Sequence, residues 1–148
     1  DSSSGRKITI QLVGSVHPNI RDTIQRSNIQ KYVSILSYQP HQKAIQILVD
    51  SDYIFLVVPN QDKNKGIIPG KIFEYFKCQS EIILIGNKKS EAALLTKELG
   101  YQNIFEINEK FDFNNLTINQ SLDQESTSKF ERKNLTASLA QVFDEINA

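Results

Sequence analysis

The sequence predicts an α/β protein with a single Rossmann-like, doubly wound parallel sheet of five or six strands and helices on both faces. Three observations predict this fold. Short apolar runs alternate with stretches whose apolar residues have helical spacing. The run at residues 53–58 (YIFLVV) is apolar on both faces, as in the middle of a covered sheet. Five strand–helix repeats then favour parallel strands joined by right-handed crossovers.

The predicted strands are short apolar runs, several of which end at a glycine or a proline. We expect them at residues 7–13, 32–36, 53–58, 82–85 and 103–107. In sheets of this kind, ligands bind beyond the carboxyl ends of the strands. The loops expected to meet a ligand are therefore those that follow Val13, Leu36, Val58, Ile85 and Ile107.

The predicted helices lie at residues 18–27, 40–50, 70–78, 90–100 and 128–146. Ser90 is a suitable N-cap, and Gly100 stands where a helix C-terminus favours a left-handed residue. The third helix is expected to direct its apolar side toward the core through Ile72, Phe73 and Phe76, with Cys78 as a small core residue. The last helix is expected to bury one stripe, namely Leu135, Leu139, Val142, Phe143 and Ile146. Residues 108–126 are expected to form a solvated loop.

Length and charge limit the classes of protein. The 148 residues fit one domain, which we place at residues 7–148 behind a disordered or appended leader at residues 1–6. The 17 basic and 17 acidic residues balance, so we expect no nucleic-acid partner. We expect no transmembrane segment, because no apolar run reaches the roughly 20 residues that a spanning helix needs. The absence of methionine and the polar start indicate a piece cut from a longer protein.

The loop after the third predicted strand has the strongest functional signal. Lys63, Lys65 and Lys71 gather where the third helix begins. A cation at a helix N-terminus opposes the macrodipole by about 0.3–1 kcal/mol, so a lysine cluster there indicates a bound anion such as a diphosphate. Glu74 lies on the same helical face as Lys71 and could accept hydrogen bonds from ribose hydroxyls. Spacing alone favours a surface ion pair between the two, worth about 0.2–0.5 kcal/mol.

The stretch GIIPGKIFEYF at residues 66–76, followed by the strand at 82–85, resembles the P-x-K-x-x-E-Y signature of glycosyltransferases of the family 4 (group 1) type. Residues 38–45 (YQPHQKAI) and 52–59 look like the segment that leads into the central strand of the same family. The resemblance covers about residues 7–146. It implies the C-terminal, donor-binding half of a two-domain enzyme of the B-type fold.

The resemblance also implies roles for individual residues. Glu74 matches the glutamate that holds the ribose of the nucleotide. Lys71 matches the region that meets the diphosphate and the transferred sugar, and we expect it to be catalytic. The remaining donor-binding residues are expected to be Gly14, Ser15, Tyr38, His41, Gly66, Ile67, Ile68, Pro69 and Gly70. Many members carry a second glutamate eight residues before the first, where this chain has Gly66, so the sugar is not identified.

The implied function is to bind the nucleotide-diphosphate sugar for a retaining, hexosyltransferase-like enzyme of bacterial surface polysaccharide or glycolipid synthesis. Its partner would be an N-terminal acceptor domain, without which we expect no catalysis. The expected location is the cytoplasm, with the missing half as the possible contact with the inner face of the membrane. A nucleotide-sugar epimerase of the same architecture and a receiver-like signalling module are the alternatives. The receiver would need acidic residues after the first and third strands, where the chain has Gly14-Ser15-Val16 and Pro59-Asn60.

A metal cofactor is not expected. His17, His41 and Cys78 are the only histidines and cysteine, and their positions do not have metal-ligand spacing. The family type that the chain resembles is generally independent of metals. His17 follows the loop after the first strand, where an exposed histidine and a ligand contact are both open.

Overall fold

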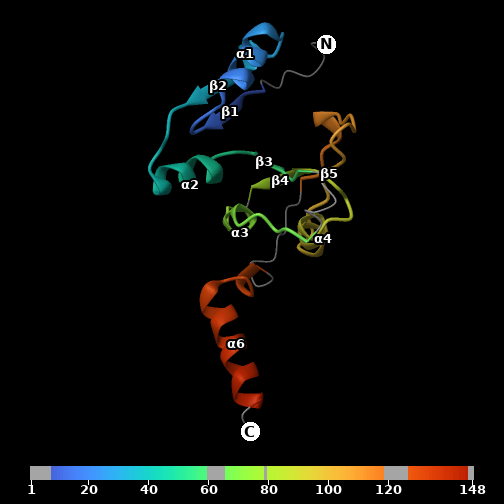
Figure 1. The fold of residues 1–148 in the computed structure, drawn as a ribbon. Coiled ribbons are helices and arrows are strands. Elements are labelled where there is room, and N and C mark those ends of the chain that lie inside the picture. The colour runs from blue at the N-terminus through green and yellow to red at the C-terminus, as the bar shows by residue number, and fades with distance from the viewer. Residues whose placement is uncertain (1–7, 60–65, 79, 119–126, 147–148) are drawn as a thin grey trace. The chain divides into compact units, whose positions relative to one another are not determined.

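The computed structural model describes residues 8–59, 66–78, 80–118 and 127–146. It divides into two compact units, which meet in sequence between Ile47 and Leu48. Unit 1 contains the elements up to most of α2, and unit 2 contains the elements from β3 onward (Figure 1). Each unit is of mixed α/β type, as the sequence predicts, and each has its own parallel sheet.

Unit 1 is a strand–helix–strand segment. Its elements are β1 (Ile10–Val13), α1 (Pro18–Arg26), the 3₁₀ helix η1 (Gln30–Tyr32), β2 (Val33–Leu36) and α2 (His41–Val49), whose last two residues belong to unit 2. β1 and β2 pair in parallel from Ile10 opposite Val33 to Val13 opposite Leu36. Proline at the first position of α1 suits a helix start, because its missing N–H would have no helical partner there.

Unit 2 contains a three-stranded parallel sheet in the order β3-β4-β5. Its elements are β3 (Tyr53–Val57), α3 (Lys71–Tyr75), β4 (Glu81–Ile85), α4 (Glu91–Glu98), β5 (Ile104–Phe105), the 3₁₀ helix η3 (Phe113–Asn115) and α6 (Arg132–Ile146). Helices connect β3 to β4 and β4 to β5, as parallel strands require. Ser90 and Gly100 bound α4 as predicted: the Ser90 hydroxyl accepts from the Ala93 N–H, and Gly100 has a φ of 93°.

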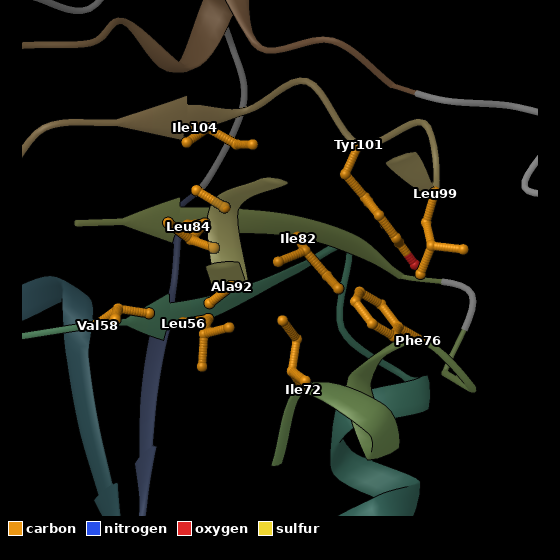
Figure 2. Packing of buried hydrophobic residues seen from close by; sticks show 11 residues of the cluster. Leu56, Val58, Ile72, Phe76, Ile82, Leu84, Ala92, Leu99, Tyr101 and Ile104 are labelled. Carbon is orange, nitrogen blue, oxygen red and sulfur yellow. The ribbon is translucent and has the colours of Figure 1, made fainter. Parts of the chain in front are cut away.

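The hydrophobic core lies on one face of the unit 2 sheet. Alternate residues of β3 and β4 point to this face, where α3 and α4 cover them (Figure 2). Ile72 is fully buried and Phe76 nearly so, which confirms the predicted inward side of the third helix. The Phe76 ring stacks on Tyr101, with 5.8 Å between centroids, and Phe130 packs against Phe76 from the segment that precedes α6.

The opposite face of this sheet has a polar clamp. The buried Asn103 side chain donates to the Thr117 carbonyl at 2.8 Å and accepts from the Thr117 N–H at 3.0 Å. It also donates to the Glu81 carboxylate at 3.4 Å. The clamp holds the segment after η3, where Leu116 is buried. Part of the predicted solvated loop is therefore folded against the sheet.

The predicted single sheet of five or six strands is wrong, because the structure has one sheet of two strands and one of three. Burial explains the difference. A strand in the middle of a larger sheet is buried on both faces, whereas β1 exposes Gln11 and Val13 between half-buried residues. Its apolar run predicted a strand correctly but did not specify its neighbours.

Three elements also differ from their expected bounds or burial. α3 has five residues, and the chain continues to Cys78 as tight turns in which Lys77 and Cys78 donate to carbonyls three residues earlier. β5 has two residues, because the Glu106 N–H bonds the Glu109 carboxylate instead of a strand. The predicted burial of the last helix is wrong. Five apolar residues of α6 are 49% to 72% exposed: Leu135, Leu139, Val142, Phe143 and Ile146.

Candidate functional site

The helix α3 places Lys71 and Glu74 on an exposed surface of unit 2. Both residues are exposed, while Ile72 and Phe76 on the other side of the same segment are buried in the core. The alternation follows from the helical period, since residues three apart share a face. Ile72 and Phe76 pack into the core (Figure 2). This packing keeps Lys71 and Glu74 on the exposed side of the helix.

The charge of Glu74 affects its neighbours. Burial raises the pKa of the Tyr75 hydroxyl above its usual range, and the Glu74 carboxylate adds to the increase. Burial likewise raises the pKa of the Cys78 thiol, again with a contribution from Glu74. The Cys78 thiol donates to the Glu74 carbonyl at 3.2 Å and is 4% exposed. Cys78 is thus a protonated core residue, as predicted, and not a reactive thiolate.

The segment before α3 has an apolar surface. Ile67 and Ile68 are 52% and 37% exposed, Gly66 and Gly70 are exposed, and Pro69 is half-buried. The Pro69 carbonyl accepts from the Ile72 N–H at 3.0 Å. Gly70 is the N-cap of α3 and offers no side chain to the first-turn amides. The predicted lysines Lys63 and Lys65 lie outside the described residues, so Lys71 is the described cation of this cluster.

The carboxyl ends of β3, β4 and β5 are joined by main-chain hydrogen bonds. The Val58 N–H donates to Ile85, and the Gly86 N–H donates to Phe105. Beyond them, the Lys88 N–H donates to the Glu106 carboxylate at 3.1 Å, and the Lys88 ammonium pairs with Glu109 at 2.6 Å. The loops after β4 and β5 are therefore connected to each other at the edge where α/β sheets bind ligands.

The predicted donor-binding residues of unit 1 follow its two strands. The Gly14 N–H donates to the Leu36 carbonyl, so the loop with Ser15 and the loop with Tyr38 begin side by side. Gly14 has a φ of 111°, a conformation that side-chain-bearing residues rarely adopt. Tyr38 is 82% exposed, and His41 is exposed at the start of α2.

His17 has a local structural role. Its Nδ1 atom accepts from the Asn19 N–H at 3.2 Å, which makes His17 the N-cap of α1. The side chain is exposed. A ring nitrogen that accepts from a backbone amide stabilises the helix start and needs no ligand.

The structure thus places the predicted site residues in two groups. Lys71, Glu74 and the segment 66–70 belong to unit 2, and Gly14, Ser15, Tyr38 and His41 belong to unit 1. The sequence prediction did not identify Lys88, Glu106 and Glu109, although it named the loops after Ile85 and Ile107. Their signal was opposite charges after neighbouring strands, which becomes informative only when the strands are known to be adjacent.

Among the described residues, His, Cys, Asp and Glu side chains do not gather in a group of three that could hold a metal ion. Within the same part of the chain, the helices are too short or too polar to cross a membrane. Comparison of the sequence and the structure with protein-family models, curated proteins and solved structures found no match.

Proposed function

We propose that this chain is the donor-binding domain of a retaining glycosyltransferase that uses a nucleotide-diphosphate sugar. One observation carries the proposal: Lys71 and Glu74 are exposed together on α3, in the stretch that resembles the donor-binding signature. The parallel sheets with helical connections support it as Rossmann-like elements.

The two side chains have complementary chemistry for such a donor. The Glu74 carboxylate can accept hydrogen bonds from both hydroxyls of a ribose. The Lys71 ammonium can stabilise the negative charge that builds on the diphosphate as it leaves the sugar. A helix of five residues has a small macrodipole, so Lys71 carries more of this role than the sequence suggested.

The proposal extends to the reaction, the acceptor and the further donor-binding residues of the intact enzyme. Transfer would require an acceptor-binding domain, so we propose that this chain binds donor but does not transfer sugar alone. The acceptor would belong to a bacterial surface polysaccharide or glycolipid, made on the cytoplasmic side. Gly14, Ser15, Tyr38 and His41 are proposed to contribute to donor binding from the ends of β1 and β2.

The test is a calorimetric or NMR titration with UDP, GDP, ADP and TDP. We expect saturable binding of one nucleotide, weakened at least about tenfold in Glu74→Ala by loss of charge-assisted hydrogen bonds. Lys71→Ala is expected to weaken binding of the nucleoside diphosphate more than binding of the corresponding nucleoside, because the nucleoside has no phosphates for Lys71 to contact.

Glu91→Ala is the matched control. Glu91 is also an exposed glutamate in the first turn of a helix of unit 2, but it lies on α4. Its removal is expected to leave binding unchanged. Equal losses in Glu74→Ala and Glu91→Ala, or no binding of any of the four nucleotides at millimolar concentration, would contradict the proposal.

A further inference from the structure

The helix α3, which carries Lys71 and Glu74, is too short to keep its own position. It has five residues, and its N-cap Gly70 makes no side-chain hydrogen bond to the first turn. Isolated helices shorter than about 12 residues are marginal in water. The place of α3 therefore depends on its contacts with the rest of unit 2.

The core holds α3 along one side. Ile72 and Phe76 are buried there, on the side away from the proposed site. By the helical period, Phe73 lies on the flank of the helix beside Glu74, between the core side and the exposed side. Phe73 is half-buried. What packs against Phe73 therefore limits how far the helix can roll about its own axis.

Phe130, in the segment before α6, packs against this flank. The centroid of its ring lies 5.8 Å from that of Phe73 and 6.3 Å from that of Phe76. The segment is itself turned, because the Phe130 N–H donates to the Thr127 carbonyl at 3.1 Å. An aromatic ring from a distant part of the sequence thus closes the flank of α3.

The residues on either side of Phe130 attach the same segment to α4 and to the end of α3. Lys129 pairs with Glu98, the last residue of α4, at 2.5 Å. Glu131 pairs with Lys77, just beyond α3, at 3.5 Å. Both ion pairs are exposed to water, where such pairs contribute little to stability. We therefore expect the ring of Phe130 to provide most of the contact and the ion pairs to fix its place.

We propose that residues 129–131, which we call the brace, position α3 for nucleotide binding, and that Phe130 is the positioning residue. Phe130 acts through α3 and does not touch the nucleotide. It keeps the helix from rolling, so that Lys71 and Glu74 face the same ligand. The inference rests on the proposed function, because it concerns the site that these two side chains form.

Hydrogen exchange by NMR tests the brace without any nucleotide. The Phe76 N–H donates to the Ile72 carbonyl at 3.0 Å and reports on α3, whereas the Ile83 amide on β4 reports on the whole unit. In Phe130→Ala, the ratio of the Phe76 exchange rate to the Ile83 exchange rate is expected to rise at least about tenfold. A loss of global stability alone would raise both rates together.

Phe111→Ala is the matched control. Phe111 is also half-buried and also contacts two rings, those of Phe105 and Phe113, neither of which belongs to α3. Its removal should leave the ratio of the two exchange rates unchanged. Equal ratios in the Phe111→Ala and Phe130→Ala chains would overturn the brace, as would a Phe76 amide that is already unprotected in the wild-type chain.

Glu131→Lys is a second variant, which leaves the core intact. Glu131 is exposed, and its reversal sets two like charges together at Lys77. We expect the ratio of the two exchange rates to rise about two- to threefold. If Phe130→Ala does not fold, an unchanged ratio in Glu131→Lys overturns the brace.

Nucleotide titration tests the positioning role. Phe130→Ala is expected to weaken binding of whichever of UDP, GDP, ADP and TDP the wild-type chain binds, by about three- to thirtyfold. Phe130→Leu keeps an apolar contact and should retain most of the affinity. In a Glu74→Ala background, Phe130→Ala should weaken binding by a smaller factor, because Phe130 then has one side chain fewer to position.

The positioning role and the proposed function fail in different ways. Binding that is unchanged in Phe130→Ala, or weakened by the same factor with and without Glu74, would overturn the positioning role and leave the proposed function standing. A wild-type chain that binds none of the four nucleotides would overturn the proposed function, and with it the positioning role, whatever the exchange rates show.

Discussion

At the end of β4, Gly86 lies where the backbones of two strands come close together. A Cβ atom added to Gly86 would lie 2.7 Å from the Val58 carbonyl oxygen and 3.1 Å from the Val58 Cβ. The first of these contacts is with backbone, which cannot rotate away. Glycine is therefore required here by lack of space, and it lets β3 and β4 pair up to their carboxyl ends.

We expect Gly86→Ala to lower the free energy of unfolding by about 1–3 kcal/mol, because the extra methyl group forces the two strands apart. Urea denaturation checks this. Gly66→Ala is the control, since a Cβ at Gly66 would meet nothing within 4 Å. Equal effects of the two substitutions would show that the close approach at Val58 is not what constrains Gly86.

Single residues were predictable where their role is local. Ser90 and Gly100 follow from the chemistry of helix ends, and Cys78 follows from its place in an apolar pattern. Gly86 was visible as the end of a strand, but its contact with Val58 arises only when β3 and β4 are aligned. The buried Tyr101 hydroxyl, which lacks a hydrogen-bond partner in the described part of the chain, likewise has no sequence signal.

The loops after β4 and β5 are connected by hydrogen bonds and an ion pair among three charged residues. Lys88 contacts Glu106 through its backbone and Glu109 through its ammonium group, and the Glu109 carboxylate also accepts from the Glu106 N–H. The hydrogen bond with Lys88, followed by the one with the Glu106 N–H, holds the pKa of Glu109 below its ordinary value of 4.5.

A lowered pKa in the folded state stabilises the fold above the ordinary pKa, and this stabilisation is lost as the pH falls through the lowered value. We therefore expect Glu109 to titrate below pH 4.5 in an NMR titration of its carboxyl carbon. Lys88→Gln should return the pKa toward 4.5. Lys89→Gln, at an exposed neighbouring lysine, should not, and an unchanged pKa in Lys88→Gln would exclude the ion pair as the cause.

Elements were predictable in kind more than in extent. Every predicted strand and helix has a counterpart in the structure, because apolar period reports local geometry. The ends of α3 and β5 depend on hydrogen bonds made by Cys78 and Glu106. The spacing of apolar residues in the sequence gives no information about these hydrogen bonds. The apolar stripe of α6 was identified correctly from its helical spacing. The spacing does not show whether the stripe is buried against protein or exposed to water.

The two units differ in how deeply their described side chains are buried. The described residues of unit 1 are all exposed or half-buried, whereas unit 2 has Ile82, Ile83 and Leu84 fully buried on β4. Unit 2 therefore holds the hydrophobic core, and its central strand is covered on both faces. Local stability follows buried apolar contact, so opening should differ between the units.

We expect hydrogen exchange by NMR to be slowest for the amides of β4 and much faster for those of β1 and β2. The ladder hydrogen bonds of unit 1 have less buried apolar surface to protect them. Equal protection of Ile35 and Ile83 would contradict this expectation and would indicate that the two units unfold as one.

The exposure of the two main proposed site residues could be predicted from the sequence, but the pairing of the strands around them could not. Lys71 and Glu74 were expected on one helical face and are both exposed on α3. Joining five strands into one sheet required knowing which strands pair, and hydrophobic runs do not encode partners. The neighbour of each strand depends on packing between elements that are distant in sequence.

The register of the unit 2 sheet also affects how this unit folds. Tyr53 pairs with Glu81 and Leu84 pairs with Ile104, so none of the ladder can form within a local stretch of chain. Each pairing must first close a long loop, whose entropy is lost before the contacts compensate for it. We therefore expect the capped helix α4 to form before the strands pair, and the joining of β3 to β4 to limit the rate at which the core assembles.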